Sequence, residues 1–381
     1  METGLAVNGQ SALDRLLTSV PAQKALSLHE AHPRRAAAAF FMAGVGWDAA
    51  TIFRIDSVLD NVIISAYLMA LTGLYAAATL HEAGRLTQPT LVRFVRWFGM
   101  ASQFLMGALF SMFVFFYSQS ASWSETSIFL IVLVGFLIAN EVLHDRMFSA
   151  RLRMALLFFV LASYLVYFVP ILMGAMSHLA FLSGLLAAAS IVGLVTFGLW
   201  SKGVFRQPGQ LAWTGVTVAI LLVFLEAAYL LNWIPPVPMA VREAGVYHQI
   251  RKTGDEYKLR YAAPPWYLPF ARDESPFLYS PGDTVAVYTA VFAPTRIRTG
   301  IVHVWENRAD NAAEWQETDR IAYVVSGGRG NGYRGYTQKR KVFPGQWRVR
   351  VETDNGRLLT RVAFDVIRAP EPVNRWKWRT Q

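Results

Sequence analysis

The sequence contains no cysteine among its 381 residues. Disulfides, cysteine nucleophiles and metal sites built on thiolates are therefore excluded. The sequence also lacks the G-x-S-x-G and H-E-x-x-H signatures of hydrolases and metalloproteases. Charged residues are scarce at 16%, whereas 54% of the residues are hydrophobic, which is unusual for one soluble fold. The composition therefore indicates a membrane protein, and the sequence contains none of these catalytic motifs.

The positive charge is concentrated in the C-terminal part of the chain. Residues 1–239 contain 13 Lys and Arg against 11 Asp and Glu, whereas residues 240–381 contain 23 against 15, a net charge of +8. The apolar part is thus nearly neutral and the polar part is basic. We expect a membrane all-α bundle followed by an all-β domain.

A helix needs about 20 mostly apolar residues to cross a bilayer. Seven stretches meet this condition, and the short turn between the fifth and the sixth leaves a range of six to eight spans. The stretches are residues 36–53, 58–80, 98–118, 126–143, 153–173, 178–200 and 211–232. Residues 36–233 are therefore predicted to form the transmembrane helical domain. Residues 1–35 are predicted to be a cytoplasmic segment, because no short signal-peptide core with a cleavage site follows Arg34 and Arg35.

The loops between these stretches differ strongly in charge. With seven spans, one side of the membrane collects twelve basic residues and the other side collects only Arg54. The twelve are Arg15, Lys24, Arg34, Arg35, Arg85, Arg93, Arg96, Arg146, Arg151, Arg153, Lys202 and Arg206. Because Lys and Arg stay in cytoplasmic loops during insertion, the N-terminus is predicted in the cytoplasm and the C-terminal domain outside it.

Residues 86–96 combine Leu91, Val92 and Val95 with Arg93 and Arg96. This pattern is typical of a short interfacial helix at the cytoplasmic face. A polar loop from which the third span begins early explains it equally well, so both interpretations stay open.

Polar side chains gather toward the outer ends of the first, second and last spans. Intramembrane polar residues are expensive unless they are paired or hydrated, so they form a candidate polar cluster. Its members are Asp48, Arg54, Asp56, Asp60, Asn61 and Glu226. Asp56 and Asp60 are four residues apart, and on one helix they would share a face that holds a cation or a proton. The alternative is that Arg54 pairs with a nearby carboxylate and the others mark the water interface.

The polypeptide changes character after residue 233. Residues 234–245 begin with a proline-rich joint, since Pro235, Pro236 and Pro238 forbid a continued helix. Period-two alternation then predicts strands over 246–252, 256–261, 284–292, 300–306, 315–325, 333–341, 346–352 and 358–366. The last two, joined by the turn at Asp354-Asn355-Gly356, are predicted to form an antiparallel hairpin. About eight short strands favour an immunoglobulin-like β-sandwich over 246–368. A basic and aromatic tail, residues 369–381, follows.

The glycine-rich segment 326–336 is a candidate anion site. This segment connects two predicted strands. A dinucleotide-binding motif or a P-loop instead precedes a helix, so the segment is neither of these two phosphate-binding motifs. A turn with free backbone N–H groups and basic neighbours can still bind an anion. The candidate ligand-binding residues here are Arg329, Tyr333, Arg334 and Lys339. Glycines are also ordinary in turns that need positive φ, which is the competing explanation.

His303 and Trp305 share one face of a predicted strand. An aromatic platform beside a polar residue suits a sugar or a peptide, although Trp in a β-sandwich commonly belongs to the core. A metal is not expected, because His303 has no second histidine or carboxylate at ligand spacing. No cofactor is expected either.

Several motifs together resemble a bacterial family of multi-pass membrane proteins that end in a β domain of unknown function. They are Gly46-Trp47-Asp48 through Asp60-Asn61, Ile234 through Pro238, Tyr247-His248, His303-Val304-Trp305, Gly327 through Arg334, and Pro344-Gly345-Gln346-Trp347. The resemblance implies a bacterial inner (plasma) membrane protein with a periplasmic domain. It implies no activity, substrate or catalytic residue.

Two functions remain open from the sequence. The first is a non-enzymatic envelope protein whose basic outer domain binds an anionic lipid headgroup, a glycan or another envelope protein. The second is a membrane-embedded enzyme or transporter that uses the polar cluster near the outer leaflet. Nucleic acid is not expected as a partner, because the basic domain is predicted on the side of the membrane that lacks it.

Overall fold

A computed structural model describes most of the chain. Apart from the isolated residue 23, the described residues are 33–51, 57–120, 149–207, 209–234, 239–263, 272–294, 297–308, 314–327, 332–369 and 375–381. The chain divides into two compact units. The first comprises residues 1–114, 132–161 and 188–221, and the second comprises residues 115–131, 162–187 and 222–381.

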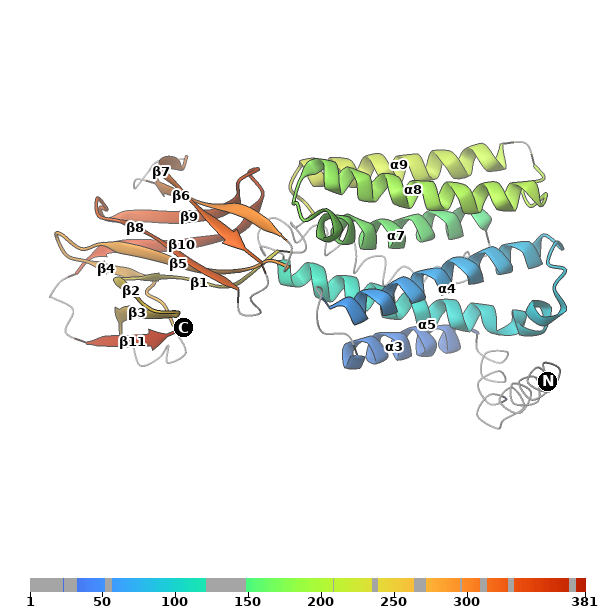
Figure 1. The fold of residues 1–381 in the computed structure, drawn as a ribbon, viewed down its shortest axis with the longest axis horizontal. Helices are drawn as coiled ribbons and strands as arrows, with labels where there is room; N and C mark the ends of the chain where they lie inside the picture. The colour runs from blue at the N-terminus through green and yellow to red at the C-terminus, as the bar shows by residue number, and fades with distance from the viewer. Residues whose placement is uncertain are drawn as a thin grey trace. The chain divides into compact units, whose positions relative to one another are not determined.

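The described residues form six long helices, drawn as coiled ribbons in Figure 1. Their bounds are α3 Pro33–Thr51, α4 Val58–Glu82, α5 Pro89–Ser120, α7 Ala150–Met173, α8 His178–Ser201 and α9 Gln210–Leu230. Five of the six, α4, α5, α7, α8 and α9, are long and apolar enough to cross a membrane, and α3 contains a shorter apolar stretch, Ala38–Trp47. The predicted fourth span, 126–143, lies outside the described residues.

Residues 89–96 belong to the same helix as the third predicted span. Helix α5 starts at Pro89 and continues without interruption to Ser120. Proline suits the first turn of a helix, because the N–H that it lacks has no intrahelical partner there. Of the two interpretations of residues 86–96, the early start of the third span is therefore the one observed.

Two glycines allow α3 and α5 to pack closely in the first unit. A Cβ atom on Gly44 would collide with the backbone carbonyl of Phe104, and one on Gly107 would collide with that of Phe41. Small residues at such positions let apolar helices approach each other without a polar contact. The pair Gly44 and Gly107 thus explains why this helix contact forms.

Basic loops lie together at one end of the helices of the first unit. Arg153, at the start of α7, forms a buried ion pair with Glu82 at the end of α4. Arg206, in the loop before α9, donates a hydrogen bond to the carbonyl of Ala83 at 3.2 Å. The α4–α5 loop, the α8–α9 loop and the start of α7 therefore share one end.

The remaining described residues form eleven strands in three sheets (Figure 1). The strands are β1 Ala240–Tyr247, β2 Gln249–Thr253, β3 Glu256–Ala262, β4 Phe277–Tyr279, β5 Val285–Phe292, β6 Arg298–Arg308, β7 Gln316–Ser326, β8 Tyr333–Lys339, β9 Gly345–Thr353, β10 Leu358–Arg368 and β11 Trp376–Thr380. The sheet orders are β1-β5-β8, β4-β10-β9-β6-β7 and β11-β3-β2.

Strand β5 is buried on both faces and lies at the centre of this region. Val285 and Val287 pack with Trp305 and Phe364 of the five-stranded sheet. On its other face, Tyr288 and neighbouring alanines pack against the β11-β3-β2 sheet. The β1-β5-β8 sheet is therefore the middle of three layers.

The predicted hairpin near the C-terminus is confirmed. Strands β9 and β10 are antiparallel, with Val349 opposite Val362 and Trp347 opposite Phe364. These four side chains are buried in one core cluster. The sequence pattern predicted neither β4, which has three residues, nor β11, which turns part of the expected tail into a strand paired with β3.

We expect Phe364→Ala to destabilise the β region by about 3–5 kcal/mol, because the side chain is buried between two sheets. Ile367→Ala on the same strand should cost less than about 0.5 kcal/mol, because Ile367 is 43% exposed. Urea unfolding of the full chain in detergent, followed by tryptophan fluorescence, measures both. Equal losses would contradict this assignment of the core face.

Candidate functional site

His303 is fully buried and lies in a hydrogen-bonded network between two sheets. Its Nδ1 atom is 2.8 Å from the Thr337 hydroxyl, and its Nε2 atom is 3.1 Å from the Thr289 hydroxyl. The Trp305 indole donates to Thr337 at 3.1 Å, and Tyr323 shares a hydrogen bond of 2.6 Å with Thr289. We call these five residues the His303 network.

The His303 network is part of the core. Both His303 and Trp305 are 0% exposed, so neither side chain offers a platform to a ligand. Desolvation lowers the pKa of His303 to about 4, which keeps the imidazole neutral at physiological pH. Burial likewise raises the pKa of the Tyr323 phenol. Hydrogen bonds from two threonines offset the cost of burying the ring.

The predicted anion site near the glycine-rich segment is largely occupied by the protein itself. The Arg334 guanidinium donates to the carbonyls of Asp255 and Gln381, both at 2.8 Å. Lys339 forms an ion pair with Asp319, and burial lowers the pKa of its ammonium group. Tyr333 packs against a core cluster. Arg329 lies outside the described residues.

The polar residues at the start of α4 serve as a helix cap. The Ser57 side chain accepts a hydrogen bond from the Asp60 backbone N–H at 3.3 Å. The Asn61 side chain donates to the Ser57 carbonyl at 2.9 Å. A carboxylate in the first turn also complements the positive end of the helix dipole. Ser57 thus contacts the backbone of Asp60 and the side chain of Asn61.

Glu226 has a partner that the sequence did not indicate. It forms a hydrogen bond with the ring of His178, which begins α8, and both residues belong to the second unit. Asp60 and Asn61 belong to the first unit. The Asp48 side chain, Arg54 and Asp56 lie outside what the structure describes.

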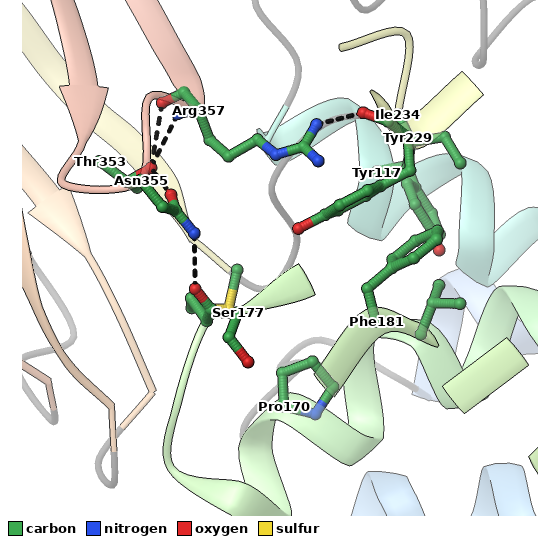
Figure 2. A pocket seen from close by; sticks show the side chains of 11 residues that line it. Tyr117, Pro170, Ser177, Phe181, Tyr229, Ile234, Thr353, Asn355 and Arg357 are labelled. Carbon is green, nitrogen blue, oxygen red and sulfur yellow. Dashed lines mark hydrogen bonds between the residues drawn. The ribbon is translucent and has the colours of Figure 1, made fainter. Parts of the chain in front are cut away.

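The β9–β10 turn contacts helix ends within the second unit. Arg357 donates to the carbonyl of Tyr229 (Figure 2). It also donates to the Asn232 side chain at 2.8 Å. Its guanidinium also lies 3.3 Å from the centre of the Tyr229 ring. Asn355 donates to the Met176 carbonyl at 2.8 Å. A cation at the C-terminal end of α9 is favourable, because the helix dipole is negative there.

The pocket beside this contact is too small for an organic ligand. It is lined by Tyr117, Phe181, Tyr229, Ile234 and Arg357, among others, and Figure 2 shows these side chains around it. Its volume is about 20 Å³, which is room for a single water molecule. Burial lowers the pKa of Arg357. The contact therefore has a structural role.

The outer face of the five-stranded sheet is rich in charge but internally paired. Glu306 forms ion pairs with Arg348 and Arg350, and Glu352 pairs with Arg350 at 2.8 Å. Arg320 pairs with Glu317 at 3.1 Å. Arg320, Arg348 and Arg350 of this sheet are thus already compensated by carboxylates.

The outer face of the β11-β3-β2 sheet carries cations that lack such compensation. The strand register places Arg251 beside Lys258, and Arg260 beside Trp378, while Trp376 lies two residues before Trp378 on the edge strand. We call these five residues the basic–aromatic face. In the described part of the chain, none of its three cations lies in an ion pair, and Glu256, the first residue of β3, is an acid on the same face in register.

The indoles and guanidiniums of the basic–aromatic face are stacked on one another. The Arg260 guanidinium lies 4.5 Å from the Trp376 ring centre and 5.9 Å from that of Trp378. Arg251 lies 5.6 Å from Trp378. Such cation–π contacts hold the cations in place without neutralising them. The face can therefore attract an anion.

A buried hydrogen bond between a histidine and a carboxyl group supports this face from behind. His248, between β1 and β2, contacts Glu274 through Nδ1 at 2.7 Å and packs edge-on against Trp376. Glu274 also accepts hydrogen bonds from the backbone N–H groups of Ala262 and Leu278. Over the described ranges, no group of three or more His, Asp or Glu side chains is arranged to hold a metal ion.

Residues 298–366 match the DUF2914 family model, which describes a protein of unknown function. The match spans β6 to β9 and most of β10, and it leaves out the helices and the basic–aromatic face. A domain of unknown function in the C-terminal region agrees with the resemblance seen in the sequence. No curated protein matches the chain. No solved structure matches it either.

The His303 network predicts a pH-dependent stability. Because the pKa of His303 is about 4 in the folded protein and about 6.5 when unfolded, only the unfolded state takes up this proton between those values. The free energy of unfolding should therefore fall by about 2 kcal/mol between pH 7 and pH 5. His303→Gln should remove this part of the fall, as measured by urea unfolding at both pH values. An identical pH dependence in both proteins would contradict it.

Proposed function

We propose that the chain is a non-enzymatic integral membrane protein of the bacterial cell envelope whose β region lies outside the cytoplasm and binds an anionic ligand. The ligand classes are a lipid headgroup, a glycan and an acidic protein partner. The observation that carries the proposal is the basic–aromatic face, where three cations lack carboxylate partners in the described chain and two of them, Arg251 and Arg260, lie against indole rings.

The distribution of charge over the helices supports the orientation. The described loops at one end, 83–88 and 202–209, contain Arg85, Lys202 and Arg206, whereas the described loop 174–177 contains no charged residue. Basic loops stay in the cytoplasm during insertion. The end of α9, and the β region that follows it, then emerges on the opposite side, in the periplasm of an inner-membrane protein.

The strand order supports an immunoglobulin-like sandwich for the two larger sheets. Sheet β1-β5-β8 has the order of immunoglobulin strands A, B and E, and β10-β9-β6-β7 has the order of strands G, F, C and C′. Trp305 on β6 then occupies the strand that carries the buried tryptophan of such domains. Strands β2, β3 and β11 add a third sheet that displays the basic–aromatic face.

The described members of the polar cluster favour binding over an embedded enzyme or transporter. The Asp60 carboxylate lies in the first turn of α4, where it complements the helix dipole, the Asn61 side chain donates to the Ser57 carbonyl, and Glu226 contacts His178. Each of these positions therefore has a structural role that needs no substrate or transported ion.

The orientation predicts the outcome of reporter fusions. Alkaline phosphatase placed after Gln381 should be active, and green fluorescent protein at the same place should be dark, because the β region is outside the cytoplasm. Alkaline phosphatase inserted after Gln207, in the loop before α9, should be inactive. The opposite pattern at the two positions would place the β region in the cytoplasm and contradict the proposal.

The binding function predicts that a polyanion binds through the basic–aromatic face. Labelled dextran sulfate should bind the full chain in a neutral detergent with an affinity that falls as salt is added. The triple variant Arg251→Gln, Lys258→Gln, Arg260→Gln should bind about tenfold or more weakly, since each lost charge contributes about 0.5–1 kcal/mol. Fluorescence anisotropy measures both.

A matched triple variant controls for net charge. Arg298→Gln, Arg340→Gln and Arg368→Gln remove three exposed cations elsewhere in the β region, and binding should stay within about twofold. If both triple variants weaken binding equally, net charge rather than this face attracts the polyanion, and the proposal fails.

A further inference from the structure

The basic–aromatic face combines indole rings, cations and neutral hydrogen-bonding groups on one surface. Gln249, Thr253 and Thr380 lie on the same face in register, beside the cations and the two tryptophans. Trp378 is 46% exposed, so much of its ring is open to a ligand. A ligand that uses all of these groups needs an apolar surface, negative charge and hydroxyls.

From this juxtaposition we infer that the face binds a linear acidic glycan, one whose sugars carry carboxylates. This inference rests on the proposed function and names its ligand class. The C–H face of a pyranose ring stacks on an indole, as an apolar surface does on an aromatic one. The carboxylate of the same sugar meets a guanidinium, which favours paired hydrogen bonds. The amide and hydroxyl side chains meet the sugar hydroxyls.

The spacing of the face fits a chain of sugars rather than one small ion. Trp376 and Trp378 are two residues apart on one strand, which separates them by about 6.8 Å, and neighbouring strands are about 4.8 Å apart. Arg260 lies opposite Trp378 and within reach of both rings, and Lys258 with Arg251 forms the next row. The rings on β11 and the cations on β3 and β2 therefore lie side by side over a surface several residues wide, and an extended polymer can contact both kinds of group.

The alternatives explain fewer of these features. A membrane surface supplies negative charge but is best met by long apolar side chains, whereas this face carries Gln249, Thr253 and Thr380 on the same side of the sheet as its indoles. An inorganic polyanion supplies charge but no C–H surface for Trp378. Nucleic acid is not expected on the outer side of a membrane.

The test compares oligogalacturonate with polyphosphate of matched charge, using the full chain in a neutral detergent. Trp378→Ala should weaken oligogalacturonate binding about tenfold and leave polyphosphate binding within about twofold. Trp378→Phe should retain most of the glycan affinity, which separates loss of the ring from loss of folding. Phe343→Ala is the matched control, because Phe343 is a similarly exposed aromatic residue outside the face, at 48%.

Each outcome decides between the ligand classes. If Trp378→Ala weakens both polymers equally, or neither, the glycan inference is overturned while the binding of anions stands. If vesicles containing phosphatidylglycerol bind in a Trp378-dependent way and oligogalacturonate does not, the ligand is a lipid surface and the inference is overturned. If the intact chain binds no polyanion at all, the proposed function fails as well.

Discussion

The arrangement of the β region depends on the burial of strand β5 on both faces. Its valines pack into the five-stranded sheet, so the alternate positions, among them Tyr288, need a second cover. The β11-β3-β2 sheet supplies that cover through Ile250, Leu259 and Tyr261. Because a strand alternates its side chains, burying one face of β3 obliges Lys258 and Arg260 to point away from the core. The basic–aromatic face is thus a consequence of the way in which β5 is enclosed.

The two exposed sheet surfaces differ in whether their cations are neutralised by nearby carboxylates. On the five-stranded sheet, Glu306 compensates Arg348 and Arg350 of the adjacent strand, and Glu352 compensates Arg350 along the same strand. On the three-stranded sheet, Arg251 and Arg260 lie against indoles, which hold their position but leave their charge intact. A net charge alone does not distinguish these situations. What distinguishes them is the identity of the side chain in the neighbouring strand.

The sequence was sufficient for features that depend on neighbours along the chain. Alternation around Trp347 and Val362 predicted the β9–β10 hairpin, and long apolar runs predicted the described helices. The burial of His303 was not predictable in the same way, because Thr289, Thr337 and Tyr323 reach it from three other strands. The sequence also predicted that Arg334 could bind an anion, because the groups that contact it are not close to it along the chain. Its carbonyl partners, on Asp255 and Gln381, are distant in sequence.

The basic–aromatic face was missed because its parts are also far apart in sequence. Trp376 and Trp378 follow a proline-containing stretch and looked like a tail, while Arg251 and Lys258 lie more than a hundred residues earlier. Only the pairing of β11 with β3 joins them. A surface built on paired strands has fixed spacings before a ligand arrives, so binding does not first have to order it. The paired strands of this sheet therefore make a suitable scaffold for recognising an extended polymer.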